Sequence, residues 1–196
     1  MIAGVILAGG AGTRIGGDKA LAPFRGASLL DAVVARVRRQ VDQLALSIPA
    51  SGADAYRACF EGPLLFDTLA DAGPLAGIVA GLEWARGSAQ WLATFPCDTP
   101  FLPTDLVAQL MRGAADAPVA ARNRERLHGV CAVWPVQCLA RLRSGVEQGQ
   151  LRSLRDALKY LGGTIQDFDG EPDAFFNVNT PEDLVRAETM AKDSPI

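Results

Sequence analysis

A glycine-rich segment close to the start of the chain carries two cationic side chains. The sequence GGAGTRIGG, from Gly9 to Gly17, has five glycines in nine residues, with Arg14 inside it and Lys19 two positions after it. Backbone N–H groups can approach phosphate oxygens closely where no Cβ intervenes, and glycine also tolerates positive φ angles. A guanidinium can bind a phosphate through two donors, and an ammonium adds a compact charge. The segment therefore predicts a phosphate-binding loop rather than an exposed turn.

Two common phosphate-binding motifs do not fit this segment. In a Walker loop a Ser or Thr follows the lysine and holds magnesium, but Lys19 is followed by Ala20. In a dinucleotide fingerprint the sixth position is glycine, but here it is Ile15. The acidic ribose ligand expected after the second strand is also missing, because SIPA stands there. These departures disfavour a P-loop NTPase and a nicotinamide-dependent oxidoreductase.

The pattern of apolar residues predicts the strands and helices that position this loop. Residues 2–7 form a continuous apolar run, typical of a strand buried on both faces. Helical spacing follows over 28–44, where Ser28 and Asp31 resemble a capping box, and a second strand is expected at 44–48. Further helices are expected over 53–60, 75–82, 104–113 (capped by Thr104), 136–161 (two helices) and 180–191, and further strands at 63–66, 90–95, 119–122, 130–134, 164–168 and 175–178.

Strands that alternate with helices predict a three-layer α/β/α Rossmann-like fold with a mostly parallel, twisted sheet. We expect one domain over residues 1–190 and a frayed tail over 191–196. Ligands of such sheets bind beyond the carboxyl ends of the strands. The glycine loop and the later segments SIP, DTLAD and PCDTP each follow a predicted strand, so all four should meet at one edge of the sheet.

Composition limits the class of protein. The 196 residues carry a net charge of −3, which argues against a nucleic-acid-binding protein. No two of the four cysteines have C-x-x-C spacing and the chain has a single histidine, so no structural zinc site is expected. We expect no signal peptide and no membrane span, and hence a soluble cytoplasmic protein, active as a monomer.

Four segments in the same order resemble one family. LAGGAGTRIGGDKAL is similar to the L-A-G-G-x-x-x-R-M-G-x-x-K signature of nucleotidyltransferases with a glycosyltransferase-A-like fold, and most of all to that of the molybdenum cofactor guanylyltransferases. DTLADAGPLAGI, PCDTPFLP and FFNVNTPEDL resemble three later motifs of those enzymes. The resemblance extends from Gly4 to about Ala187. It implies a nucleotide-binding half over 1–105 and an acceptor-binding half over 106–190.

The resemblance also implies a reaction: transfer of GMP from GTP to the terminal phosphate of molybdopterin, with Mg²⁺ as cofactor and pyrophosphate as product. Arg14, Lys19 and Asp98 would be the catalytic residues, and Asp98 would bind both nucleotide and metal. Where relatives often have Asn at the end of the second strand, this chain has Ser47. The implied GTP-binding residues are Leu7, Ala8, Gly9, Gly10, Gly12, Lys19, Ser47, Asp67 and Asp98; Asn177 and Asn179 would lie near the acceptor phosphate, and we add Arg152 and His128 as candidate acceptor contacts.

The residue types suit this chemistry. A phosphate acceptor is already an anion, so it needs charge neutralisation and positioning rather than a Ser, Cys or His nucleophile. No histidine lies near Cys97 in the sequence, which disfavours a thiol nucleophile. The product would pass to cofactor-insertion proteins and molybdoenzyme apoproteins by transient contact.

Three alternatives remain open: a CTP-dependent molybdopterin cytidylyltransferase, another sugar-phosphate or small-acid nucleotidyltransferase, and a nucleotide-binding protein without activity. Relatives that use CTP typically have L-A-A-G, and the space left by Gly9 would suit a purine.

Overall fold

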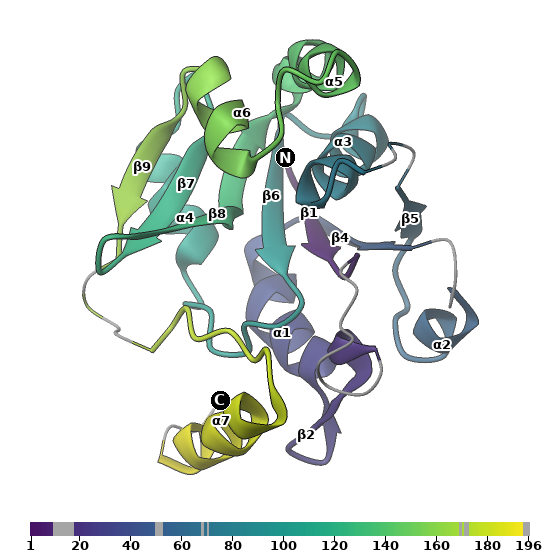
Figure 1. The fold of residues 1–196 in the computed structure, drawn as a ribbon, viewed down its shortest axis with the longest axis vertical. Helices are drawn as coiled ribbons and strands as arrows, with labels where there is room; N and C mark the ends of the chain where they lie inside the picture. Colours follow the sequence, from purple (N-terminus) through teal and green to yellow (C-terminus); the bar gives the residue numbers. More distant parts are fainter. Residues whose placement is uncertain are drawn as a thin grey trace.

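The computed structural model describes residues 1–9, 18–49, 53–67, 69, 71–168, 170 and 173–193. Over these residues the chain forms a seven-stranded sheet with helices on both faces, as the sequence predicts (Figure 1). The strand order is β5-β4-β1-β6-β8-β7-β9. The strands are β1 (Ile2–Leu7), β4 (Gln43–Ile48), β5 (Leu64–Phe66), β6 (Trp91–Pro96), β7 (Val119–Asn123), β8 (Arg126–Pro135) and β9 (Thr164–Asp167).

One strand runs against the other six. β8 pairs antiparallel with both β6 and β7, whereas β4, β5 and β6 extend β1 in parallel and β9 pairs parallel with β7. β8 reverses because only Arg124 and Glu125, both with positive φ, connect it to β7, and such a short turn joins antiparallel strands. The prediction of a mostly parallel sheet is therefore confirmed.

Two apolar layers cover the sheet. Along β1, Val5 packs into one layer and Ile6 into the other, which explains why an uninterrupted apolar run was needed there. One layer contains α1 (Leu29–Val37), α2 (Ala53–Arg57) and α4 (Leu106–Arg112). The other contains α3 (Pro74–Ala85), α5 (Leu139–Glu147) and α6 (Leu154–Tyr160).

A third, smaller apolar cluster lies at the base of the molecule in Figure 1. It joins the hairpin β2 (Pro23–Phe24) and β3 (Ala27–Ser28), the start of α1 and the last helix, α7 (Pro181–Asp193). Side chains of Phe24, Leu29, Phe101 and Ala187 are buried in it. The cluster fixes the C-terminal helix beside the edge of the sheet where β1 and β6 end.

Several local predictions differ from the structure. The helix expected over 28–44 is shorter, because α1 ends at Val37, a 3₁₀ turn covers Arg38–Gln40 and β4 begins at Gln43. Thr104 does not cap the fourth helix, because α4 begins at Leu106 with Asp105 in the N-cap position. Residues 175–178 form no strand; the Val178 N–H instead donates to the carbonyl of Asp98. α7 continues to Asp193, so it includes part of the predicted tail, and residues 194–196 lie outside the described residues. In the described part of the chain, no helix has the length and apolar character that crossing a membrane requires.

Candidate functional site

The ends of neighbouring strands are joined at one edge of the sheet, here called the carboxyl edge. The N–H of Ala8, after β1, donates to the Ser47 carbonyl in β4 at 2.8 Å. The N–H of Cys97, after β6, donates to the Leu7 carbonyl at 3.4 Å. These bonds hold the predicted loops side by side. Three predicted residues, Gly10, Gly12 and Arg14, lie outside the described residues.

Lys19 is the centre of a polar cluster at this edge. Its Nζ donates to Asp98 Oδ2 at 2.5 Å and to Asn179 Oδ1 at 2.6 Å. The side chains of Lys19 and Asp98 are only 15 % and 16 % exposed, so the ion pair is largely shielded from water. The structure thus brings together three residues that the sequence singled out and that lie up to 160 positions apart.

Asp98 is held from two further directions. Its carbonyl accepts the Val178 N–H at 2.9 Å, which ties the C-terminal segment to the loop after β6. The Thr99 hydroxyl lies 3.1 Å from Asp98 Oδ1 and 3.3 Å from Asn177 Oδ1. Sequence reasoning missed Thr99, although its place directly after Asp98 in PCDTP was a usable signal. Carboxylate, amide and hydroxyl oxygens therefore converge beyond the end of β6.

A second polar group lies beyond β4 and β5. The buried Ser47 hydroxyl donates to Asp67 Oδ1 at 2.9 Å. Burial raises the pKa of Asp67, and the Ser47 hydrogen bond partly opposes the rise. A Cβ on Gly9 would lie 3.1 Å from Asp67 Oδ2, so any larger residue at this position would crowd the carboxylate. The shorter Ser47 side chain thus still positions Asp67.

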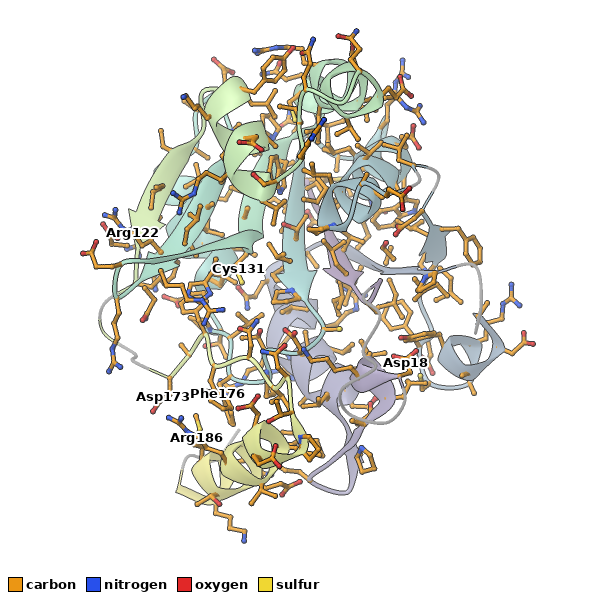
Figure 2. All side chains as sticks on the ribbon, in the orientation of Figure 1. Asp18, Arg122, Cys131, Asp173, Phe176 and Arg186 are labelled. Atoms are coloured by element: carbon orange, nitrogen blue, oxygen red, sulfur yellow. The ribbon has the colours of Figure 1, made fainter. Side chains whose placement is uncertain are left out.

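A buried tyrosine supports the turn that presents Lys19. The Tyr56 hydroxyl, from α2, donates to Asp18 Oδ1 at 2.6 Å. Asp18, labelled in Figure 2, also caps the short 3₁₀ helix η2 (Lys19–Leu21). Burial and the adjacent Asp18 carboxylate raise the pKa of Tyr56 well above its usual value, so the phenol remains a donor. Sequence reasoning missed Tyr56, because only a short helix over 53–60 was expected there.

The two candidate acceptor contacts, His128 and Arg152, have other partners than the Lys19 cluster. His128, in β8, stacks on Phe175 with ring centroids 4.5 Å apart. Burial, assisted by Arg126, lowers the pKa of His128 to about 4, so its ring is neutral at pH 7. Arg152 is exposed in the loop before α6, where its Nε donates to the Gly149 carbonyl at 3.4 Å. Their roles at the acceptor stay predictions.

Comparison with known proteins assigns this chain to a family. A family model described as a MobA-like NTP transferase domain matches residues 4–162. The chain belongs to the MobA-like NTP transferase family. A molybdenum cofactor guanylyltransferase from Rhodopseudomonas palustris (strain HaA2) is 41 % identical over 201 residues, with 97 % of this chain and 92 % of that protein covered. Another from Rhodobacter capsulatus is 42 % identical over 191 residues, with 95 % of each chain covered.

A solved structure supports the MobA-like fold. Molybdopterin-guanine dinucleotide biosynthesis protein A from Archaeoglobus fulgidus has a TM-score of 0.79 to this chain at 22 % identity, with 98 % of this chain and 100 % of that one covered. The family model ends before Asn177 and Asn179, whereas the full-length relatives cover nearly all of the chain. In this MobA-like chain the C-terminal segment thus adds contacts to the site from outside the matched region.

The oxygen donors at the carboxyl edge fit one hard divalent cation. Mg²⁺ favours oxygen ligands and is often held by one or two carboxylates together with substrate phosphates. Asp98 supplies a carboxylate, and Asn177 and Asn179 supply amide oxygens. No group of three or more His, Cys, Asp or Glu able to hold a metal exists among the residues that the structure describes. The carboxylate and amide oxygens present are of the kind that hold Mg²⁺ together with substrate phosphates.

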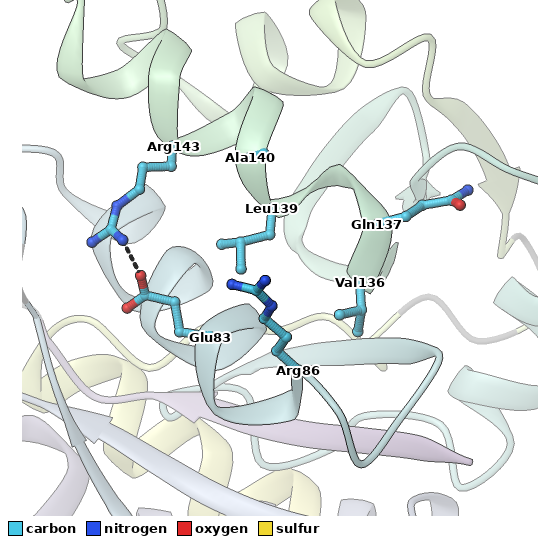
Figure 3. Close-up of a pocket in the computed structure, with 7 residues that line it drawn as sticks. All are labelled: Glu83, Arg86, Val136, Gln137, Leu139, Ala140 and Arg143. Carbon is cyan, nitrogen blue, oxygen red and sulfur yellow. Dashed lines mark ion pairs between the residues drawn. The ribbon is translucent and has the colours of Figure 1, made fainter.

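Neither a thiol nor a remote hollow belongs to this MobA-like site. Burial and the Asp98 carboxylate raise the pKa of the Cys97 thiol to about 12, so it is protonated at neutral pH and a poor nucleophile. A hollow of about 620 Å³ lies between the end of α3 and the start of α5. Figure 3 shows the residues that line it, among which Arg143 pairs with Glu83. It contains none of the predicted site residues.

Proposed function

We propose that this protein transfers GMP from GTP to the terminal phosphate of molybdopterin, releases pyrophosphate and requires Mg²⁺. The observation that carries the proposal is the cluster of Lys19, Asp98 and Asn179 at the carboxyl edge of a MobA-like domain. Full-length relatives at about 40 % identity bear the name molybdenum cofactor guanylyltransferase. The product would pass to proteins that insert the cofactor into apoenzymes, and we expect a cytoplasmic monomer.

The reaction needs little covalent help from the protein. An oxygen of the acceptor phosphate attacks the α-phosphorus of GTP; the bond to that phosphorus forms, the bond to the β-phosphate oxygen breaks, and pyrophosphate leaves with the electron pair. Because the attacking oxygen is already anionic, no general base has to remove a proton. Catalysis then rests on aligning two anions and neutralising the transferred phosphoryl group.

Lys19 and Asp98 have complementary tasks in this scheme. The Lys19 ammonium would neutralise phosphate oxygens of the nucleotide, with Arg14 as a second cation. Mg²⁺, held by Asp98 with amide oxygens of Asn177 and Asn179, would supply Lewis-acid neutralisation of the phosphates. At pH 7 the His128 ring is a neutral imidazole rather than an acidic imidazolium, which suits a hydrogen-bonding or stacking contact with the pterin better than acid catalysis.

The Asp67 site favours guanine over cytosine. Guanine presents two neighbouring N–H donors on its pairing edge, and a carboxylate can accept both. Cytosine presents a single amino donor there, next to an acceptor nitrogen that the carboxylate would repel. The Ser47 hydrogen bond orients Asp67, and a side chain at position 9 would crowd its Oδ2. These contacts support GTP as the donor, with CTP as the alternative.

The test mixes the purified protein, Mg²⁺ and molybdopterin with GTP or CTP and measures the release of pyrophosphate. We expect turnover with GTP, and a loss of about 10²–10³-fold in Asp98→Asn, a magnitude typical when one electrostatic contact to the transition state is removed. Asp71→Asn is the matched control, because Asp71 is exposed in the neighbouring loop and Asn tolerates its positive φ of 54°. Faster release from CTP would overturn the guanylyl assignment.

A further inference from the structure

The ammonium of Lys19 donates hydrogen bonds to two side-chain oxygens that could also bind a metal ion. Its Nζ is within hydrogen-bond distance of both Asp98 Oδ2 and Asn179 Oδ1, at 2.5 and 2.6 Å. The side chains of Lys19 and Asp98 are only 15 % and 16 % exposed, so little water reaches the ion pair. A singly charged cation built into the chain therefore sits beside the oxygens that a metal ion would use.

We propose that Lys19 is a placeholder cation that keeps the metal position closed until the nucleotide arrives. The inference rests on the proposed function, in which Asp98 holds Mg²⁺ and Lys19 binds phosphate. Mg²⁺ binds oxygen at about 2.1 Å, so sharing Asp98 Oδ2 with the ammonium would bring two cations within a few ångströms of each other. Metal can enter only as the ammonium leaves.

The nucleotide gives the displaced ammonium a new partner. A largely shielded ammonium without a counter-charge is costly, so a metal ion alone must compete with an ion pair already made. Phosphate oxygens of GTP restore that partner through charge-assisted hydrogen bonds. Metal and nucleotide binding are thereby coupled through one side chain, and the site stays closed to free divalent ions.

The surrounding contacts let the side chain move while its supports stay fixed. The turn Lys19–Leu21 is capped by Asp18, which Tyr56 holds at 2.6 Å. On the other side, the carbonyl of Asp98 is fixed by the Val178 N–H. The four-carbon stem of lysine has enough rotatable bonds to swing between Asp98 and a phosphate.

The wild-type protein offers a direct test, because Lys19, Lys159 and Lys192 are the chain's three lysines. Nitrogen–proton NMR spectra of the lysine ammonium groups should show a distinct Lys19 signal in the free protein. We expect Mg²⁺ alone to leave this signal in place, and Mg²⁺ with GTP to shift it, while Lys159 and Lys192 stay unchanged. A shift by Mg²⁺ alone at the same concentration would overturn the proposal, as would a Lys19 signal like those of the exposed lysines.

A second test measures metal binding without nucleotide, with Mn²⁺ as the probe and its electron paramagnetic resonance signal as the readout. We expect Lys19→Met to bind Mn²⁺ about tenfold more tightly than the wild type, because the competing charge is gone. Lys159→Met is the matched control, since it changes net charge equally at an exposed position. The double variant Lys19→Met/Asp98→Asn should lose the gain. Equal Mn²⁺ affinity in Lys19→Met and wild type would overturn the proposal.

Measuring pyrophosphate release from GTP on the same wild-type protein separates the two ideas. Turnover with GTP, together with unchanged Mn²⁺ affinity in Lys19→Met, would reject the placeholder and leave the proposed function standing. A gain in Mn²⁺ affinity without any nucleotide transfer would support the placeholder and overturn the proposed function.

Discussion

Single side chains at the carboxyl edge work through their neighbours. Asp67 depends on Ser47 for its orientation, and Lys19 depends on Asp18 and, behind it, on Tyr56. Tyr56 is neither a proposed metal ligand nor a residue predicted to bind substrate. Its hydroxyl is therefore a positioning group, whose effect should reach the nucleotide only through the turn that begins at Lys19.

Tyr56→Phe removes that hydroxyl without changing the packing of the ring. We expect a raised KM for GTP, a smaller change in kcat, and a loss of about 1 kcal/mol in unfolding free energy, because Asp18 loses one hydrogen bond. Steady-state kinetics and urea unfolding measure both. Tyr160→Phe is the control, since Tyr160 is the chain's other tyrosine and is exposed. Equal KM values in the two variants would exclude a positioning role.

His128 makes stability depend on pH. Its pKa is lowered from 6.5 to about 4, so the unfolded chain binds its proton first as the pH falls. Its contribution is complete above pH 6.5 and is lost progressively toward pH 4, which makes the folded state less stable in acid.

The variant His128→Phe should keep the stack on Phe175 and remove the titration. On going from near pH 7 to near pH 4.5, we expect the wild type to lose about 1–2 kcal/mol more than His128→Phe, after discounting the shift for residual solvent contact. Urea unfolding at both pH values measures the difference. Parallel losses in the two proteins would mean that His128 titrates normally.

At the scale of elements, two glycines of α3 allow a close approach to the sheet beneath the nucleotide side of the site. A Cβ on Gly77 would lie 2.7 Å from Ser47 Oγ and 2.9 Å from Leu7 Cδ2. A Cβ on Gly81, one turn later, would lie 2.9 Å from both Leu92 Cδ2 and Val5 Cγ1, inside the core. Substitutions at the two glycines therefore disturb the same helix, but only the one at Gly77 disturbs a residue of the site.

Gly77→Ala should push Ser47 and so displace Asp67, whereas Gly81→Ala should disturb only the core. Overpacking costs about 1–3 kcal/mol, from which about 1 kcal/mol of helix propensity is recovered in both variants. We expect GTP affinity, measured by calorimetry, to fall about tenfold in Gly77→Ala and to stay unchanged in Gly81→Ala. An equal fall in both variants would mean that the effect is general loosening rather than displacement of Asp67.

The sequence predicts the elements wherever one local signal dominates. The apolar run of residues 2–7 predicts β1, and the capping box of Ser28 and Asp31 predicts the start of α1; neither prediction needs information from the rest of the chain. Residues 175–178 have the composition of a strand, but the sheet ends at β9, and their backbone bonds to the Asp98 loop instead. Tyr56 was missed because its partner Asp18 is set by tertiary packing, which spacing along one sequence does not reveal.

At the scale of the whole molecule, the two ends of the chain close the site together. Asn179 reaches Lys19 because α7 is anchored on the third apolar cluster and because the Arg25 N–H donates to Glu188 Oε1 at 2.8 Å. Arg186 lies over the ring of Phe176, 4.8 Å from its centroid, and strengthens the turn into α7 (Figure 2). The family model ends at residue 162, so this closure lies beyond the matched region.

Ala187→Asp tests whether α7 holds Asn179 in place. Ala187 is fully buried in the third cluster, so a carboxylate there should detach α7 and cost several kcal/mol locally. The two larger apolar layers do not include α7 and should remain folded. We therefore expect amide protons over 181–193 to lose protection from hydrogen exchange and GMP transfer to fall at least tenfold, while β1, β4 and β6 stay protected. Val185→Asp, on the same helix but 68 % exposed, should change neither quantity. Full transfer activity in Ala187→Asp with α7 detached would show that Asn179 is dispensable, and loss of protection throughout the sheet would show that the C-terminal helix is part of the core rather than a clamp on the site.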